Sequence, residues 1–288
     1  CRELPLDPVT ILIAVVGLLA TALWAYMMLY EQFKLQVKEL ELSFPNLPAA
    51  FDGYTILHLS DLHVTKLGLL ERRLMEIVGD REVDACFVTG DVTANPRASD
   101  VWRRVCSAIR HRDPIYSILG NSEHKPWLDE GTIVEALTIP GLVMLVNSSS
   151  VIRRGEDTIR VVGVDDPYSH RSDCDAAFQG VDPRGFIVYL THCPSTTPEG
   201  VARGADLVLA GHTHGGQVRF PLIGLLYTHS RRNKKLNDGL YTSERLSRLL
   251  KTDVGDSVLY VNRGVGTSRI HIRLLCPPEV VYITLRKQ

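Results

Sequence analysis

Short apolar runs that each end in polar residues recur along this chain of 288 residues. The clearest runs are YTILHLSD (54–61), ACFVTGD (85–91), IYSILGN (115–121), FIVYLTH (186–192) and DLVLAGH (206–212). Their length and their content of β-branched residues predict strands that are buried on both faces. Further strands are predicted at 142–146, 158–164, 257–262 and 279–286.

Two helical patterns separate the first three of these strands. Residues 69–79 and 98–111 carry apolar side chains at three- and four-residue spacing, which is typical of a helix that covers a sheet. Alternation of strand and helix predicts parallel strand pairing with right-handed crossovers. The expected fold class is therefore α/β, and a chain of this length can bury a sizeable core.

An apolar segment precedes this α/β region. Val9 to Tyr30 is a run of 22 residues without a charge. As a helix it would be about 33 Å long, which is enough to cross the hydrocarbon core of a bilayer. Trp24, Tyr26 and Tyr30 lie toward one end, where interfacial aromatic residues belong. We expect a membrane anchor over residues 1–33 and a catalytic domain over 34–288.

The apolar segment has two other interpretations. Ala20-Thr21-Ala22 resembles the cleavage site of a signal peptide, but Arg2 is the sole basic residue before the run, and the run exceeds a signal core. A buried core helix is the other alternative. For an anchor, Lys34 and Lys38 follow the span while Arg2 precedes it, which favours a cytoplasmic catalytic domain.

Charge and cysteine content limit the partners and the cellular compartment that we expect for this chain. The chain has 32 basic and 33 acidic residues, so no broad positive field attracts nucleic acid, and no nucleic-acid partner is expected. The six cysteines show no close pairing pattern, which argues against a disulfide framework and favours a reducing compartment.

Polar side chains stand where the predicted strands end. In an open α/β sheet, ligands bind beyond the carboxyl ends of the strands, so these side chains should converge on one edge. They offer carboxylate, amide and imidazole ligands without thiolate, a set that suits manganese first and also iron, zinc or cobalt. The residues are Asp61, His63, Asp91, Asn121, His192, His212 and His214.

Seven ligands are enough for two divalent ions that share one carboxylate. Two ions about 3.5–4 Å apart can lower the pKa of a water molecule between them and clamp the oxygens of an in-line displacement. This arrangement predicts the hydrolysis of phosphoesters.

The ordered motifs resemble those of the calcineurin-like metallophosphoesterase superfamily. They are SDLH (60–63), TGD (89–91), GNSE (120–123), THCP (191–194) and GHTHGGQV (211–218). The resemblance covers about residues 51–286. With VGVDDPY (162–168) and CPPEV (276–280), it is similar to the membrane-associated bacterial branch that includes YkuE-like and UDP-2,3-diacylglucosamine pyrophosphatase-type enzymes. It implies a four-layer αββα sandwich.

The resemblance also implies a role for each ligand. Asp61, His63 and His214 would hold one metal ion, and Asn121, His192 and His212 would hold the other. Asp91 would bridge the two ions and thereby take part in catalysis. Gly215 and Gly216 would let the backbone approach the site closely, although they are also compatible with an ordinary turn.

One motif departs from the family pattern. After Asn121 the family has a histidine that contacts the phosphoryl group and assists the leaving group, but here the residue is Ser122. A histidine follows two positions later, at His124. Either His124 reaches back into the site as the catalytic acid, or it is a surface loop residue and the enzyme lacks that acid.

These observations predict a phosphohydrolase anchored in the bacterial inner membrane. The expected substrate is a lipid-linked phosphate or pyrophosphate such as UDP-2,3-diacylglucosamine, cleaved to UMP and an acylated sugar 1-phosphate in lipid A biosynthesis. The alternatives are a general phosphodiesterase and a degenerate, non-catalytic scaffold. Two features carry weaker signals. The polar segment 226–256, which contains RRNKK (231–235), is predicted to be a solvated loop, with contact to lipid head groups or phosphate as the alternative. The glycine-rich NRGVGTSR (262–269) follows a predicted strand, where backbone amides can bind a phosphate.

Overall fold

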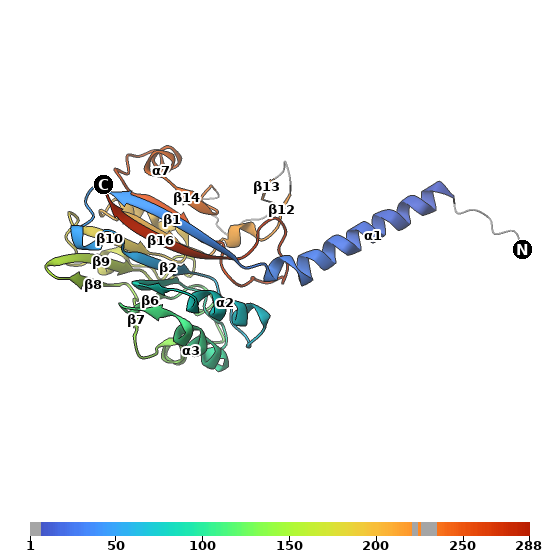
Figure 1. Cartoon of the computed structure of the whole chain (residues 1–288), viewed down its shortest axis with the longest axis horizontal. Helices are drawn as coiled ribbons and strands as arrows, with labels where there is room; N and C mark the ends of the chain where they lie inside the picture. The colour runs from blue at the N-terminus through green and yellow to red at the C-terminus, as the bar shows by residue number, and fades with distance from the viewer. Residues whose placement is uncertain (1–6, 221–223, 226–234) are drawn as a thin grey trace, which may run out of the picture.

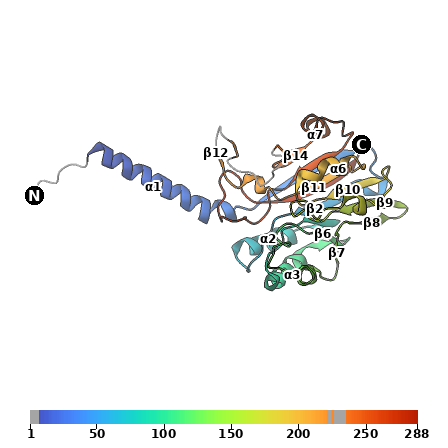
Figure 2. The same ribbon diagram turned by 180° about the vertical axis from the view of Figure 1, so that it is seen from behind.

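The computed structural model describes residues 7–220, 224–225 and 235–288. Within these residues, a single helix extends from a domain built on two large mixed sheets (Figures 1 and 2). The helix is α1 (Pro8–Leu29), and it is followed by the short 3-10 helix η1 (Glu31–Phe33). RRNKK (231–235) lies outside the described residues except for its last lysine.

The first sheet has six strands, in the order β1-β16-β2-β4-β6-β7. Neighbouring strands are parallel except β16 and β2, which are antiparallel. The strands are β1 (Gln36–Phe44), β2 (Thr55–Leu59), β4 (Ala85–Thr89), β6 (Ile115–Ile118), β7 (Leu142–Met144) and β16 (Glu279–Lys287).

The second sheet also has six strands, in the order β14-β15-β11-β10-β9-β8. Its four central strands are parallel, and the strands at both edges are antiparallel to their neighbours. The strands are β8 (Ser148–Arg154), β9 (Asp157–Gly163), β10 (Phe186–Leu190), β11 (Leu207–Ala210), β14 (Gly239–Tyr241) and β15 (Val258–Val261). Two short ribbons pair β3 (Glu82–Val83) with β5 (Arg110–His111), and β12 (Arg219–Phe220) with β13 (Gly224–Leu225).

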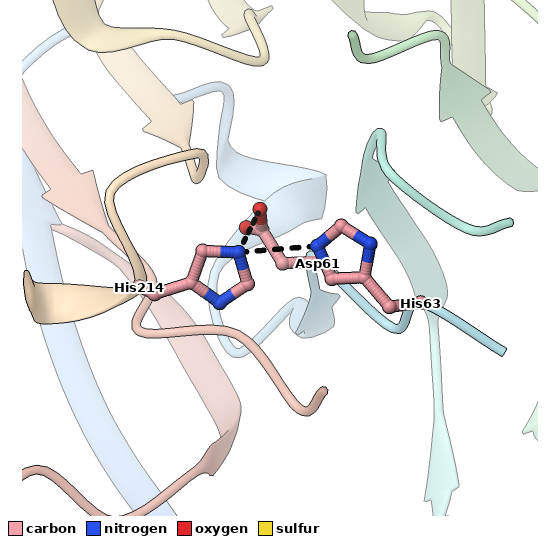
Figure 3. Close-up of side chains that lie close together, drawn as sticks. All are labelled: Asp61, His63 and His214. Atoms are coloured by element: carbon pink, nitrogen blue, oxygen red, sulfur yellow. Dashed lines mark hydrogen bonds and ion pairs between the residues drawn. The ribbon is translucent and has the colours of Figure 1, made fainter. Parts of the chain in front are cut away.

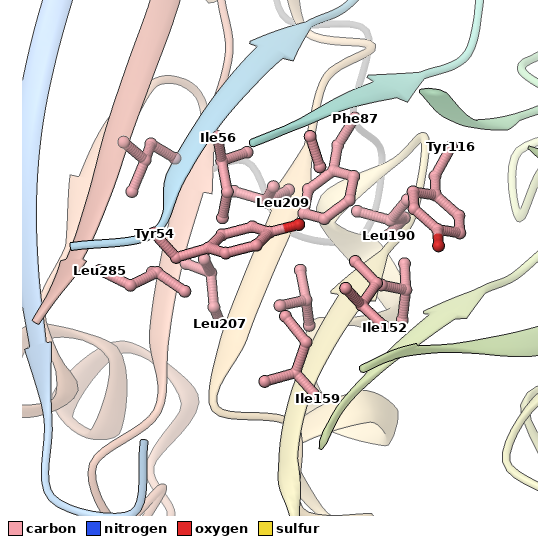
Figure 4. Close-up of a cluster of buried hydrophobic side chains, with 14 of the residues drawn as sticks. Tyr54, Ile56, Phe87, Tyr116, Ile152, Ile159, Leu190, Leu207, Leu209 and Leu285 are labelled. Atoms are coloured by element: carbon pink, nitrogen blue, oxygen red, sulfur yellow. The ribbon is translucent and has the colours of Figure 1, made fainter. Parts of the chain in front are cut away.

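The two sheets pack against each other through a shared apolar core. Ile56 and Phe87 of the first sheet belong to the same buried cluster as Leu207 and Leu209 of the second (Figure 4). Tyr54 lies in this cluster with its ring fully buried, and its hydroxyl donates to Asp113 Oδ2 at 2.8 Å. Burial on both faces explains why these strands appear as continuous apolar runs in the sequence.

Helices cover the outer face of each sheet. The first sheet packs against α2 (Leu69–Gly79), α3 (Ser99–Ala108) and α4 (Glu130–Leu137). The second packs against α5 (Cys174–Ala177), α6 (Thr197–Val201) and α7 (Ser243–Leu250). The four layers are thus helix, sheet, sheet and helix, which confirms the predicted αββα sandwich.

All nine predicted strands and both predicted helices are present, with ends that differ by at most three residues. The edge strands β1, β8 and β14 were not predicted, because half-exposed edge strands lack a continuous apolar run. The prediction of a solvated loop over 226–256 is wrong for its described part. That part contains β14 and α7, whose Leu246 is buried under the second sheet.

The strand directions place the carboxyl ends of β2, β4 and β6 at the edge of the first sheet near α1. β1 and β16 are parallel, and both begin at the end of the domain from which α1 extends (Figure 1). β2 is antiparallel to β16, so its carboxyl end lies at that same edge. β4 and β6 are parallel to β2 and end there as well.

Helix α1 has the length and composition of a membrane span, and it could cross a bilayer. Asp7 caps its first turn by accepting the backbone N–H groups of Val9 and Thr10. Its side chains are exposed apart from the last turns, where Met27 packs on Ile272 and Leu274. The reading as a buried core helix is therefore wrong.

The junction after α1 is folded onto the domain. Glu31 is buried, and its Oε1 accepts the backbone N–H of Cys276 at 2.7 Å. The backbone N–H of Arg273 also donates to the carbonyl of Met27 at 3.3 Å. The described cysteines, Cys86, Cys106, Cys174, Cys193 and Cys276, are free thiols, in agreement with the expectation of no disulfide framework.

Candidate metal centre

The seven predicted ligands lie in the loops that follow five strands of the two sheets. Five of these residues have a positive φ, between 47° and 69°, where side chains other than glycine are disfavoured. Such strained residues cluster at functional sites, because the surrounding structure must hold them there. The five are Asp61, His63, Asp91, His212 and His214.

The first set of side chains surrounds His214 (Figure 3). Its Nε2 lies 3.1 Å from His63 Nε2 and 3.3 Å from Asp61 Oδ1. His63 Nε2 lies 3.4 Å from Asp91 Oδ2. One oxygen of Asp91 therefore faces this set.

The second set surrounds His192. Its Nε2 lies 3.3 Å from Asn121 Oδ1, 3.2 Å from His212 Nδ1 and 3.4 Å from Asp91 Oδ1. The other oxygen of Asp91 therefore faces this second set. All seven predicted residues are brought together, and Asp91 stands between the two groups.

The spacing within each set fits a pair of metal ions. Two ligand atoms that are each about 2.1 Å from one ion, at angles of ~90–110°, lie about 3.0–3.4 Å apart. Within each set, the shortest distances between these nitrogen and oxygen atoms are 3.1–3.3 Å, which lie in this range. Asp61 Oδ1 is buried and accepts no hydrogen bond from the described residues, although His214 Nε2 lies 3.3 Å away. This fits a metal ligand, because a buried carboxylate oxygen without a hydrogen bond is otherwise costly.

Asp61 is held so that one oxygen points into the site. Its Oδ2 accepts the Ser60 hydroxyl at 2.6 Å and the backbone N–H of His212 at 2.9 Å, which leaves Oδ1 toward His214. Gly264 packs directly against it, since a Cβ at that position would lie 2.6 Å from Asp61 Cβ. Burial raises the pKa of Asp61 above its ordinary value.

Backbone contacts orient the other central ligands. His192 Nδ1 lies 2.7 Å from the Thr89 carbonyl and donates to it, so Nε2 presents its lone pair to the second set. The backbone N–H of Ser122 donates to Asp91 Oδ1 at 2.7 Å. Burial opposes the charge on Asp91, but attraction to His192 and His63 holds its pKa well below the usual range.

Glu123 was given no role in the sequence analysis, yet it supports the site. Its buried carboxylate accepts the backbone N–H groups of Gly120, Thr93 and Asp91 at 2.8, 3.0 and 3.1 Å. It thereby joins the loops that follow β4 and β6. Burial and the nearby charge of Asp91 raise the pKa of Glu123 to about 8. An acidic residue inside a polar turn carries no periodic signal, so the sequence could not show this buried position.

Ser122 occupies the position of the family histidine. Its hydroxyl lies 3.3 Å from His63 Nδ1, so it contacts a ligand of the first set. His124 is not a surface residue, because its side chain is 2% exposed. Its Nε2 lies 2.6 Å from Asp165 Oδ1, and this bond raises the pKa of His124 despite its burial. The contacts found among the described residues pair His124 with Asp165 and Glu130, and with no member of the two sets.

The loop after β9 is a neighbour of the site that sequence reasoning missed. The ring of Tyr168 packs on the ring of His212, with centroids 4.8 Å apart. Asp166 holds this loop by accepting the backbone N–H groups of Tyr168 and Ser169. The motif VGVDDPY had served only for the family resemblance.

The two glycine-rich segments pack closely against neighbouring parts of the structure. Gly215 has a φ of 57°, and a Cβ there would meet Arg263 Cγ at 2.7 Å and Cys276 Sγ at 2.8 Å. A glycine is therefore needed at position 215, because a larger residue there would clash with Arg263 and Cys276. In the loop 262–269, the backbone N–H of Gly266 donates to the Asp61 carbonyl at 2.8 Å, so this loop supports a predicted ligand directly.

Comparison with known proteins identifies several relatives of this chain. The uncharacterized metallophosphoesterase YkuE of Bacillus subtilis (strain 168) is 26% identical over 271 residues, which are 91% of this chain and 90% of that protein. A transmembrane protein with metallophosphoesterase domain from Danio rerio is 28% identical over 275 residues, covering 88% of this chain and 57% of the relative. UDP-2,3-diacylglucosamine pyrophosphatase LpxG of Chlamydia trachomatis serovar D is 30% identical over 160 residues, covering 54% of this chain and 45% of that protein.

A family model described as calcineurin-like phosphoesterase matches residues 54–216. This range contains β2, β4, β6, β10 and β11 and all seven residues of the two sets. The chain therefore belongs to the calcineurin-like phosphoesterase family and is a phosphoester hydrolase.

Proposed function

We propose that this chain is a membrane-anchored, dinuclear-metal phosphohydrolase that cleaves a lipid-linked pyrophosphate. The specific substrate proposed is UDP-2,3-diacylglucosamine, which would yield UMP and an acylated sugar 1-phosphate, a step of lipid A biosynthesis. The observation that carries the proposal is the position of the candidate metal centre, at the edge of the sheets from which α1 extends. A relative named for this pyrophosphatase activity supports the choice of substrate.

The residues of the two sets have distinct proposed roles. Asp61, His63 and His214 would hold one ion, Asn121, His192 and His212 the other, and Asp91 both. Two bound divalent ions, manganese in our proposal, would activate water and stabilise the charge of the phosphoryl oxygens. A shared carboxylate offsets the repulsion between two cations, which gives Asp91 its central part.

The leaving group explains how the site can function with Ser122. An alkoxide leaving from a phosphodiester needs a proton, and a positioned general acid is typically worth about 10²–10⁴-fold. When water attacks a pyrophosphate, its oxygen bonds to one phosphorus and the bridging P–O bond breaks toward the other phosphate. That phosphate has a second pKa of about 6 and leaves readily as an anion. Loss of the family histidine therefore affects pyrophosphate cleavage least.

The proposed location is the bacterial inner membrane, with one span and a cytoplasmic domain. Lys34 and Lys38 follow α1, and basic residues beside a span favour the cytoplasmic side. A nucleotide-linked lipid would meet the enzyme on that side. The expected partners are then the lipid-linked substrate and the membrane itself. No nucleic-acid partner is expected.

The second candidate is a general phosphodiesterase with a soluble substrate. The observation that favours it is the His124–Asp165 pair, because a buried imidazole paired with a carboxylate is a usual proton donor. A non-catalytic scaffold is disfavoured by the strained backbone at five of the seven predicted ligands, since a scaffold has no need for that strain.

The decisive experiment is a hydrolysis assay of the full chain in detergent with Mn²⁺. UDP-2,3-diacylglucosamine in mixed micelles is compared with bis(p-nitrophenyl) phosphate and with unactivated alkyl phosphodiesters. Efficient release of UMP is expected, and it should vanish with a chelator. Efficient cleavage of alkyl diesters without any release of UMP would overturn the proposed substrate.

Asp91→Ala tests the shared carboxylate in the same assay. We expect activity to fall at least about 10³-fold and both ions to be lost in metal analysis, because each set loses an oxygen ligand. Asp175→Ala is the matched control, since this carboxylate is exposed and pairs with Arg203. A fully active Asp91→Ala protein would exclude the two-metal centre.

A further inference from the structure

A cavity of about 420 Å³ is lined both by residues that follow α1 and by one residue of the candidate metal centre. The residues that follow α1 are Gln32 and Phe33, and the residue of the metal centre is His63 of the first set. Leu69 and Lys66 also line it. We call this cavity the anchor pocket. Its volume is in the range of pockets that hold small molecules, about 300–1,000 Å³.

The anchor pocket opens where a bilayer surface would meet the domain. α1 ends at Leu29, only three residues before Gln32. Met27 packs on Ile272 and Leu274, which fixes the end of the helix against the domain. Figures 1 and 2 show α1 leaving the domain on the side of α2, whose first residue is Leu69.

Large apolar side chains are exposed around this opening. Leu69 is 74% exposed and Phe33 38% exposed, and both line the anchor pocket. Ile270, beside the pocket residue His271, is 57% exposed. Exposed apolar side chains that gather beside a membrane span are suited to the acyl region of a bilayer.

The pocket is also lined by polar residues. Lys66 and Thr65 supply a positive charge and a hydroxyl, and the Thr267 hydroxyl lies 2.9 Å from His271 Nδ1. These groups suit a phosphate or sugar head group, whereas Phe33, Leu69 and Leu70 suit a hydrocarbon chain. The pocket therefore offers both apolar and polar side chains to one ligand.

We propose that the anchor pocket binds the acyl chain of an amphipathic lipid phosphate while the lipid remains in the bilayer. The chain lies between Phe33 and Leu69, and the phosphate reaches the metal centre past Lys66 and His63. This inference rests on the proposed function, because it assigns the lipid part of the same substrate to a place in the fold. The membrane span then helps to form the substrate site, as well as anchoring the domain.

A substitution at Leu69 tests the pocket by substrate selectivity. Each buried methylene is worth about fourfold in affinity, so loss of several contacts should have a large effect. We expect Leu69→Asp to raise KM for UDP-2,3-diacylglucosamine in mixed micelles at least about 10-fold. Activity on bis(p-nitrophenyl) phosphate should stay within about twofold. The substitution leaves α2 intact, because an acidic residue is favourable in the first turn of a helix.

Trp127→Asp is the matched control. Trp127 is 73% exposed but does not line the anchor pocket, so it should leave both activities unchanged. Equal loss on both substrates in Leu69→Asp, or no loss on either, would overturn the proposal.

A second measurement does not depend on turnover. Full-length protein in phosphatidylcholine vesicles is irradiated with a lysophosphatidic acid that carries a diazirine near the end of its acyl chain. Crosslinks are expected in the peptide that contains Leu69 and Leu70, in addition to α1, and should fall at least about fivefold in Leu69→Asp. Crosslinks confined to α1 would exclude the pocket.

The two measurements separate this inference from the proposed function. A wild-type enzyme that cleaves the soluble diester but no lipid pyrophosphate would refute the proposed substrate. The crosslinking result would still decide whether the anchor pocket binds an acyl chain.

Discussion

The carboxylate of Glu123 accepts the backbone N–H of Asp91 at 3.1 Å, so the loop after β6 holds the loop after β4 in place. The same carboxylate accepts the backbone N–H groups of Gly120 and Thr93. Asp91 has a φ of 54°, which costs free energy unless its surroundings impose it. Glu123 thus joins the two loops at this strained position, together with the bond from the Ser122 backbone N–H to Asp91 Oδ1.

Glu123→Gln should therefore weaken the metal centre without removing a ligand. Glutamine has one acceptor oxygen, so at least one of the three backbone donors is left opposite an amide N–H. An unsatisfied buried donor costs about 1–3 kcal/mol, and we expect a lower melting temperature and weaker Mn²⁺ binding. Thermal unfolding in detergent and a metal titration measure both effects.

Glu76→Gln is the control for this variant, because Glu76 is exposed and pairs with Arg73 at the surface. It should behave like the wild type. If Glu123→Gln retained wild-type stability and metal affinity, the support of Asp91 by this carboxylate would be unnecessary.

Ser122→His tests whether the enzyme lacks an acid that protonates the leaving group. A histidine here restores the family acid, so activity on alkyl phosphodiesters with poor leaving groups should rise about 10-fold or more. Release of UMP from the pyrophosphate should change little, because its leaving phosphate needs no proton. A rise in both rates by the same factor would contradict the argument.

His124→Ala separates the two interpretations of the second histidine. If His124 only holds Asp165, the variant loses stability, and its rates fall by the same factor for good and poor leaving groups. If His124 is the acid, the rate on poor leaving groups falls about 10²-fold or more, while nitrophenyl diesters are spared. We expect the first result, since His124 contacts Asp165 and no member of the two sets among the described residues.

His58 predicts a loss of stability in mild acid. It is fully buried beside Thr89, and burial lowers its pKa to about 3. In the unfolded chain its pKa is about 6.5, so below that pH the unfolded state binds a proton that the folded state does not. Stability is complete above pH ~6.5 and falls as the pH drops toward ~3. At pH ~5 the loss is about 2 kcal/mol.

The measurement is the difference in melting temperature between pH 7.5 and pH 5.0, with a chelator present in both samples. His58→Gln should show a smaller difference than the wild type, because glutamine does not titrate. The exposed His170 is the control, and His170→Asn should match the wild type. Identical pH dependence in all three proteins would refute the assignment to His58.

The junction after α1 gives the last prediction. Glu31 Oε1 accepts the backbone N–H of Cys276, so Glu31→Ala leaves a buried donor unpaired and should cost about 1–3 kcal/mol. Glu31→Gln keeps an acceptor oxygen and should recover most of that stability. Thermal unfolding of both variants in detergent makes the comparison. Equal stability of the two variants would show that this contact does not hold the junction.

Local patterns in the sequence determined much of this protein. The apolar runs predicted the central strands, because a strand buried on both faces must be apolar throughout. The polar residues after those runs predicted the site, because the carboxyl ends of parallel strands meet at one edge. The sequence pattern therefore predicts that Asp61, Asp91 and His192 belong to the site.

Other features were decided by contacts between residues far apart in the chain. The two oxygens of Asp91 face His63 and His192, which depends on how the two sheets pack against each other. His124 pairs with Asp165, 41 residues away, and no local pattern encodes such a pair. Because β16 and β2 are antiparallel, the carboxyl end of β2, where the candidate metal centre lies, is at the edge of the sheet near α1. Strand direction and packing depend on the whole chain, so only the tertiary structure placed the candidate metal centre at the edge of the domain near α1.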